Sequence, residues 1–214
     1  KMQLALEGDD WNEHFRGELL LYDNIDPGET YYIGADVSMG IRGGDWSCAQ
    51  VLDSNKKQVA TYRSQVHPDY FATVLYHLGK LFNDAFIVVE SNGHGLLTCT
   101  RLGKDMAYPH FYTETIVDKL TDKETIKLGF ATTVKSKPLI INTLRADLRE
   151  NNVSLLNKKT IKEMLTYIAT ENGSMEAEPG CHDDTVMALA LCNFVHEGSF
   201  KPIEVTDEMY IKMI

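Results

Sequence analysis

Cysteine and long apolar runs are both scarce in this chain, and each scarcity excludes a class of protein. The four cysteines among the 214 residues lie far apart and form no CxxC pair: Cys48, Cys99, Cys181 and Cys192. Such spacing argues against zinc ribbons, disulfide frameworks and redox chemistry, and favours reduced thiols in a cytosolic protein. No apolar stretch approaches the roughly 18 residues of a membrane span, and the first residues lack the apolar centre of a secretory signal. We therefore expect a soluble protein with no membrane partner.

Positive charge is also in short supply, with 21 Lys and Arg against 31 Asp and Glu, a net charge of −10. Unaided binding to a polyanion usually needs a basic surface, so the total argues against it. The deficit is uneven, however. Residues 115–163 carry ten Lys or Arg against six acids, a net of +4, which leaves −14 for the remainder. One region could follow a phosphate backbone while another gathers acids, although these lysines equally suit a solvated helix face.

The remaining composition, 43% hydrophobic and 24% charged, is typical of one main globular domain. Hydrophobic patterning predicts strands over residues 31–37, 46–53, 57–66, 85–91 and 109–114, with a hairpin insertion over 115–133. Helices are expected over residues 68–83, 92–103, 136–151, 158–169 and 181–198, with a short strand at 153–156. This order predicts an α/β fold of the ribonuclease H arrangement, a mixed five-stranded sheet flanked by helices. Its first three strands are antiparallel, and the fourth is parallel to the first. The domain spans residues 31–197, between a connecting arm (1–30) and a C-terminal tail (198–214).

Acids stand at the ends of two predicted strands and at the start of the last helix. Asp36 closes the first strand, and Glu90 follows the apolar run FIVV. Asp183 and Asp184 open the final helix. If the first and fourth strands are parallel neighbours, these carboxylates meet at one edge of the sheet, where they raise one another's pKa unless cations lie between them. Oxygen donors select Mg²⁺ or Mn²⁺, and two such ions about 4 Å apart promote phosphodiester hydrolysis.

Each acid also has a plainer interpretation. Asp183 and Asp184 would cap a helix and meet the positive end of its dipole without any chemistry. Asp36 could simply form a turn. Glu90 is harder to explain in this way, because its strand contains nothing else that is polar. The joint pattern, in this strand order, favours a metal site.

Residues near these acids allow two interpretations. His182 could be a metal ligand or a packed residue beside the helix start, and Asp45 a supplementary carboxylate or a turn former. Asn92 and His94 could orient ligands or belong to a plain loop.

Four segments in this order carry a family resemblance: YYIGADVSMGIRGGDWSCAQVLD, FIVVESNGHG, LGFATTVKSKPLIINTLRADL and CHDDTVMALALC. Together they resemble the C-terminal nuclease domain of the large terminase subunit of tailed bacteriophages, over about residues 31–197. The resemblance implies an endonuclease that cuts concatemeric double-stranded viral DNA during genome packaging, in the host cytoplasm, by two-metal hydrolysis with Mg²⁺ or Mn²⁺. It implies that Asp36 bridges both ions, that Glu90 completes one site, and that Asp184, with Asp183 beside it, completes the other.

The family's full subunit also contains an ATPase motor, but no G-x-x-x-x-G-K-[ST] phosphate loop occurs in this sequence. We therefore expect the nuclease part alone, with residues 1–30 as the remnant of a linker. The resemblance implies the ATPase domain, the small terminase subunit and the portal as partners. Lys135 and Lys137 resemble the family's basic segment before a helix and could hold a phosphate or merely solvate the helix start. Arg42, in the glycine-rich turn, could contact DNA at the same edge.

Two other functions remain open. A non-catalytic DNA-binding or motor-docking module on the same fold would bind no Mn²⁺ at the acids. An actin-like or sugar-kinase-like ATPase also begins with a strand, an Asp, a glycine turn and a strand. It needs a second such hairpin, for which 214 residues leave little room.

Overall fold

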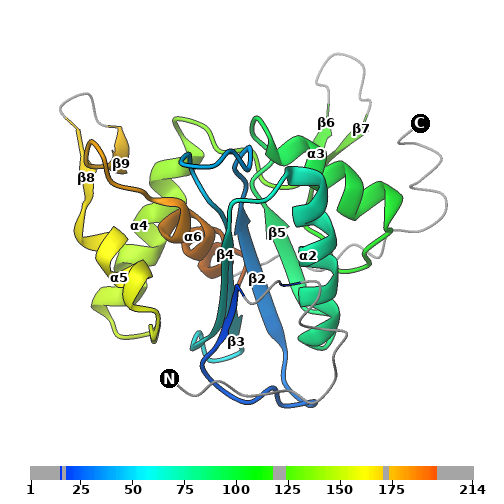
Figure 1. Ribbon diagram of the computed structural model, residues 1–214, viewed down its shortest axis with the longest axis horizontal. Helices are drawn as coiled ribbons and strands as arrows, with labels where there is room; N and C mark the ends of the chain where they lie inside the picture. The colour runs from blue at the N-terminus through cyan, green and yellow to red at the C-terminus, as the bar shows by residue number, and fades with distance from the viewer. Residues whose placement is uncertain (1–14, 16–17, 118–123, 171–173, 197–214) are drawn as a thin grey trace.

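A mixed five-stranded sheet forms the centre of the computed structural model, which describes residues 15, 18–117, 124–170 and 174–196. The strands lie in the order β1-β4-β3-β2-β5 (Figure 1). Their bounds are Leu19–Leu21, Gln58–Ser64, Ser47–Asp53, Tyr31–Asp36 and Phe86–Val89, in that order. Strands β2, β3 and β4 form an antiparallel meander, and β5 pairs in parallel with β2. The predicted α/β class and mixed sheet are thereby confirmed.

The fifth strand of the sheet is not the one that the sequence predicts. Residues 109–114 make only one isolated parallel bridge to β5, between Phe111 and Ile87. The chain then continues away from the sheet into the predicted hairpin insertion, which consists of β6 (Thr113–Val117) and β7 (Glu124–Leu128). The fifth strand is instead β1, which pairs antiparallel with the outer edge of β4. Part of the predicted arm thus belongs to the sheet, because the apolar Leu19–Leu21 satisfies an edge that would otherwise present unpaired backbone groups.

Helices cover both faces of the sheet (Figure 1). One face carries α2 (Pro68–Leu81), α3 (Gly95–Thr100) and the short π-helix η1 (Arg101–Asp105). The other carries α4 (Ser136–Arg149), α5 (Lys158–Leu165) and α6 (Asp184–His196). None of the described helices combines the length and apolar character needed to cross a bilayer.

The stretch between α4 and α6 differs from its prediction. The expected strand at 153–156 is reduced to a single bridge between Ser154 and Lys57. The expected helix 158–169 ends at Leu165, because Tyr167 and Ile168 enter a short strand. That strand, β8 (Tyr167–Ala169), forms a hairpin with β9 (Met175–Ala177), which the helical pattern did not reveal.

Helix α6 lies directly against the middle of β2, and Gly34 makes this approach possible. A Cβ atom at Gly34 would lie 2.1 Å from the carbonyl oxygen of Ala188 and 2.3 Å from the backbone nitrogen of Cys192. Both distances are far below van der Waals contact. The absence of a side chain at Gly34 therefore sets how closely the middle of α6 approaches β2.

Candidate metal centre

Asp36 and Glu90 are neighbours at the carboxyl ends of two parallel strands. The register of β2 and β5 pairs Ala35 with Val89, so the next position on each strand is Asp36 and Glu90. The backbone N–H of Glu90 donates to the carbonyl of Ala35 at 2.9 Å and continues the ladder to this point. Burial and then the charge of Glu90 raise the pKa of Asp36. Two acids separated by more than fifty residues in sequence therefore share one small volume.

The start of α6 brings two further acids toward this pair. Asp184 is the first residue of the helix and is buried, with 5% of its surface exposed. Asp183 precedes it, and its carbonyl accepts hydrogen bonds from the N–H groups of Val186 and Met187. The charges of both acids raise the pKa of Asp36. Asp36 therefore experiences the charges of the other three predicted acids.

The N–H of Thr185 in the first turn of α6 is capped from another helix. The Oε2 atom of Glu163, on α5, accepts a hydrogen bond from this N–H at 2.9 Å and another from the Thr185 hydroxyl. Glu163 is itself buried. The capping role that the sequence allows for Asp183 and Asp184 is therefore filled in part by an acid that the sequence analysis did not single out.

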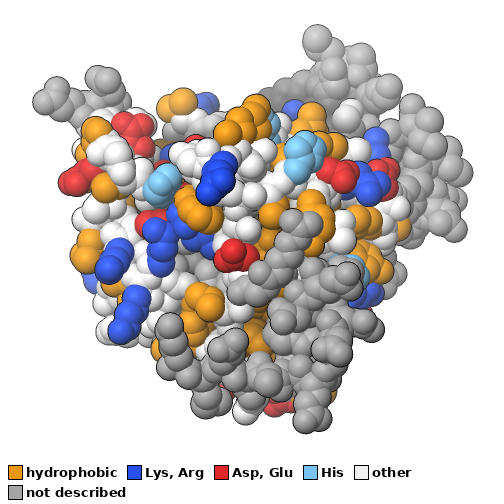
Figure 2. Space-filling view, in the orientation of Figure 1, with side chains coloured by type: hydrophobic (Ala, Val, Ile, Leu, Met, Phe, Trp, Pro, Cys, Tyr) orange, Lys and Arg blue, Asp and Glu red, His pale blue; other side chains and the backbone are white. Residues whose placement is uncertain are grey.

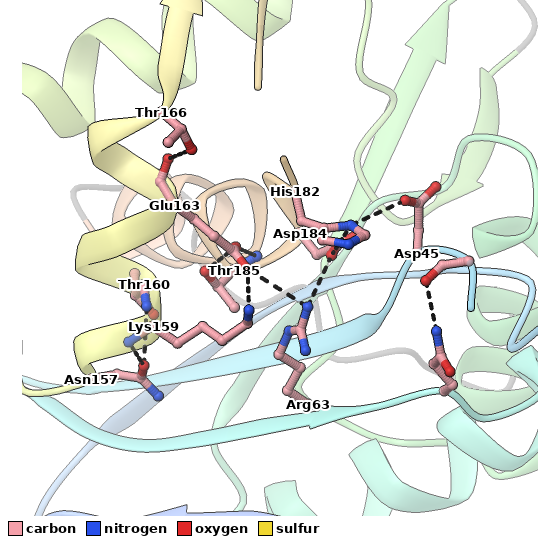
Figure 3. Close-up of polar contacts among 12 residues, drawn as sticks. Asp45, Arg63, Asn157, Lys159, Thr160, Glu163, Thr166, His182, Asp184 and Thr185 are labelled. Carbon is pink, nitrogen blue, oxygen red and sulfur yellow. Dashed lines mark hydrogen bonds and ion pairs between the residues drawn. The ribbon is translucent and has the colours of Figure 1, made fainter. Parts of the chain in front are cut away.

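The guanidinium group of Arg63 lies near Asp184 and Glu163. Arg63, on β4, stacks on the ring of Trp46 at 3.9 Å from its centroid. Its Nη2 atom lies 3.7 Å from Glu163 Oε1 and 3.8 Å from Asp184 Oδ2 (Figure 3). These distances allow charge attraction but exceed hydrogen-bond length, so Asp184 Oδ2 remains without a hydrogen-bond partner among the described residues.

The acids open onto a cavity of about 370 Å³. Asp36, Asp183 and Asp184 line it. Glu90 does not line it and lies next to Asp36 at the end of the neighbouring strand. The glycine-rich turn after β2 forms the opposite wall with residues such as Ser38, Met39, Ile41 and Asp45. The cavity therefore gives access to the acids from the sheet edge.

His182 and Asp45 extend the acidic group. The Nδ1 atom of His182 lies 3.4 Å from Asp45 Oδ1 and 3.7 Å from Asp184 Oδ2 (Figure 3). One donor atom from each of these three residues lies within 4.8 Å of the others, which suits a single metal ion. Of the predicted ligands, only Asp184 belongs to this group within the described residues. The sequence analysis left both His182 and Asp45 open. Their proximity arises because the turn between β2 and β3 folds back over the start of α6, which residue spacing alone does not indicate.

Burial and mutual repulsion disfavour the charged forms of these acids. Burial, then the neighbouring Glu90, raises the pKa of Asp36 well above its ordinary value. Burial also raises the pKa of Asp184 to about 6. The hydrogen bond that its carboxylate accepts from the backbone of Trp46 lowers this pKa and so limits the increase. The pKa of Asp183 is also raised, because the effect of burial exceeds the opposing effect of the positive charge on Lys137. A hard divalent cation fits such a surplus of oxygen donors, one of which is buried without a hydrogen-bond partner among the described residues.

Of the three predicted DNA-contacting residues, one lies against the acids. Lys137 reaches the acids, with Nζ 3.7 Å from Asp183 Oδ2. Lys135 is exposed directly before α4, and Arg42 is exposed in the turn that lines the cavity. Of the other residues weighed, His94 lines the cavity, whereas Asn92 exchanges two hydrogen bonds with the backbone of Thr132. Asn92 therefore stabilises the loop that contains Thr132.

No protein-family model matches this chain. Among solved structures, it is similar to the large terminase nuclease of the thermophilic phage G20c. The form with bound cobalt aligns with a TM-score of 0.66 and 23% identity, over 84% of this chain and 88% of that one. The form with bound magnesium gives 0.63 and 24%, over the same shares. A Thermus phage large terminase nuclease domain gives 0.62 and 22%, over 88% of this chain and 90% of the other. At these identities the comparison establishes the fold, which is the one that the sequence predicts.

Proposed function

We propose that this chain is a divalent-metal-dependent endonuclease of the terminase type, which cuts double-stranded viral DNA during genome packaging. The observation that carries the proposal is that Asp36, Asp183 and Asp184 line one cavity, with Glu90 next to Asp36 at the end of the neighbouring strand. The buried Asp184 Oδ2 has no hydrogen-bond partner among the described residues. The shared fold and the cobalt and magnesium bound by similar nucleases support it. The division into linker, nuclease domain and tail, the host-cytoplasm location, and the ATPase, small-subunit and portal partners belong to the same proposal.

Each acid has a distinct role in this account. By the family resemblance, Asp36 would ligate both metal ions. Glu90 would complete one position. Asp184 would complete the other, with Asp183 beside it and with Asp45 and His182 as supplementary ligands. When bound, two Mg²⁺ or Mn²⁺ ions would supply an activated water and stabilise the leaving oxygen of the phosphodiester.

The surrounding residues would hold these acids in place and receive the substrate. Arg63 offsets part of the charge on Glu163 and Asp184 and keeps their carboxylates near one another. Lys137 sits beside Asp183 and would neutralise a phosphate that enters the cavity. Arg42 and Lys135 would contact flanking phosphates from two sides. Nothing in the sequence is typical of a base-reading helix, so cutting should have weak sequence preference.

The test is cleavage of supercoiled plasmid with Mg²⁺ or Mn²⁺ by the wild type and by Asp36→Ala. A matched control is Asp105→Ala, an exposed acid paired with Arg101 on the opposite face of the sheet. The wild type and the control should nick and linearise the plasmid, and Asp36→Ala should lose at least about a thousandfold of the rate. Cutting by Asp36→Ala at the wild-type rate would refute the catalytic assignment.

A further inference from the structure

The solvent-facing side of α5 carries only positive charge. Its three lysines, Lys158, Lys159 and Lys162, are all exposed. With 3.6 residues per turn, these positions fall within about 100° of one another around the helix. The one acid of α5, Glu163, points inward and is buried. In Figure 2, blue side chains gather over the region that α5 occupies in Figure 1.

Two of these lysines lack the acidic partners that other exposed cations of this protein have. Ion pairs join Lys57 to Asp23 and Lys80 to Asp84. No ion pair joins Lys158 or Lys162 to any residue within the described ranges. A lysine pair left unneutralised in a chain of net charge −10 is therefore available to an external anion.

A continuous series of charged groups connects α5 with the acidic cavity. Lys159 Nζ lies 3.8 Å from Glu163 Oε1, which in turn lies 3.7 Å from Arg63 Nη2. Arg63 Nη2 then lies 3.8 Å from Asp184 Oδ2, at the wall of the cavity (Figure 3). The lysine face and the candidate metal centre therefore share Glu163 and Arg63 as a common support.

We infer that the lysine face of α5, formed by Lys158, Lys159 and Lys162, binds the phosphate backbone of double-stranded DNA and guides one strand toward the cavity. The inference rests on the proposed function for its choice of polyanion. The cavity itself repels phosphates until metal is bound, so a DNA-cutting protein of this charge needs a cationic surface beside it. Backbone contacts from lysines release counterions and hold DNA without reading its sequence.

The experiment measures binding apart from cleavage. A fluorescein-labelled DNA duplex is titrated with protein in EDTA, and anisotropy is followed over a range of salt concentrations. We compare the wild type with Lys158→Ala/Lys162→Ala. A matched control, Lys80→Ala/Lys104→Ala, removes the same two charges from exposed residues on the opposite face of the sheet. Circular dichroism establishes that all three proteins are folded.

The α5 variant should bind at least about tenfold more weakly at moderate salt, and the slope of log K against log salt should fall by about 2. The control should keep the wild-type slope. Equal slopes for both variants, or a wild type that does not bind duplex at about 50 mM salt, would overturn the inference. A wild type that binds through α5 but does not cut with Mn²⁺ would instead refute the proposed function and leave the binding surface intact.

Discussion

The carboxylate of Glu163 on α5 accepts hydrogen bonds from both the backbone N–H and the hydroxyl of Thr185 on α6. This contact satisfies one of the free N–H groups at the helix start. Asp184, next to Thr185, can therefore direct its carboxylate into the cavity. The geometry of the candidate metal centre thus depends on a residue that does not line it.

Removal of this contact should destabilise the fold. Glu163→Ala leaves the N–H of Thr185 unpaired and removes one of the two charge partners of the half-buried Arg63. We expect a loss of about 2–4 kcal/mol in the free energy of unfolding, measured by urea denaturation. Glu163→Gln keeps an oxygen acceptor for Thr185 and should cost less. Equal stability of the wild type and Glu163→Ala would contradict this role.

Gly34→Ala should displace α6 from the sheet. The added Cβ would meet the backbone of Ala188 and Cys192 at 2.1 and 2.3 Å, and backbone cannot move aside as a flexible side chain does. We expect a destabilisation of roughly 2–3 kcal/mol or more, together with weaker Mn²⁺ binding in calorimetry. Gly28→Ala is the control, because its nearest atom would be 3.5 Å away. A Gly34→Ala protein as stable as the control would disprove the tight helix–sheet contact.

The metal-free protein should lose stability as pH rises through the range in which Asp184 ionises. Burial raises the pKa of Asp184 from 3.8 to about 6, with Glu163 and Asp45 adding to the increase and His182 opposing it. The folded state therefore holds this proton more tightly than the unfolded state. The bound proton of Asp184 therefore contributes to the free energy of unfolding below about pH 4. This contribution is lost as the pH rises to about 6, a difference of roughly 3 kcal/mol.

The corresponding measurement is urea denaturation in EDTA of the wild type and Asp184→Asn at several pH values. The two proteins should have similar stability near pH 4, and Asp184→Asn should be the more stable at pH 7. A lower stability of Asp184→Asn at pH 7 would show that the carboxylate is compensated in the folded protein.

Divalent ions should reverse this loss of stability. Mn²⁺ at about 100 times its dissociation constant contributes about 2.7 kcal/mol to a protein that binds it only when folded. For a chain of this length, that corresponds to roughly 5–10 °C in melting temperature. Asp36→Asn should show little of this shift, whereas Asp105→Asn should behave as the wild type. An equal shift in both variants would place the ion away from Asp36.

The central strands and the positions of the acids follow from local sequence patterns. Alternation and apolar runs identify β2 to β5, and an acid that ends an apolar strand is visible at Glu90 without knowledge of the fold. The parallel neighbours then bring Asp36 and Glu90 together through register alone. The catalytic roles of these acids, the domain division and the DNA contacts of Lys135, Lys137 and Arg42 remain predictions.

The features that the sequence analysis missed depend on long-range contacts. β1 is a three-residue strand whose assignment requires the unpaired edge of β4. In the sequence, Glu163 is indistinguishable from an ordinary acid on an exposed helix. Its contact with Thr185 becomes visible only when α6 packs beside α5. Asp45 and His182 lie 137 positions apart, and only the turn after β2 brings them together. Local sequence patterns cannot predict contacts between residues so far apart in the chain.

The most direct test of the metal centre is anomalous diffraction from crystals of the wild type soaked in Mn²⁺. We predict two peaks, one between Asp36 and Glu90 and the other between Asp36 and Asp184. A structure without a peak within coordination distance of Asp36, or with manganese bound only at other acids, would contradict the account.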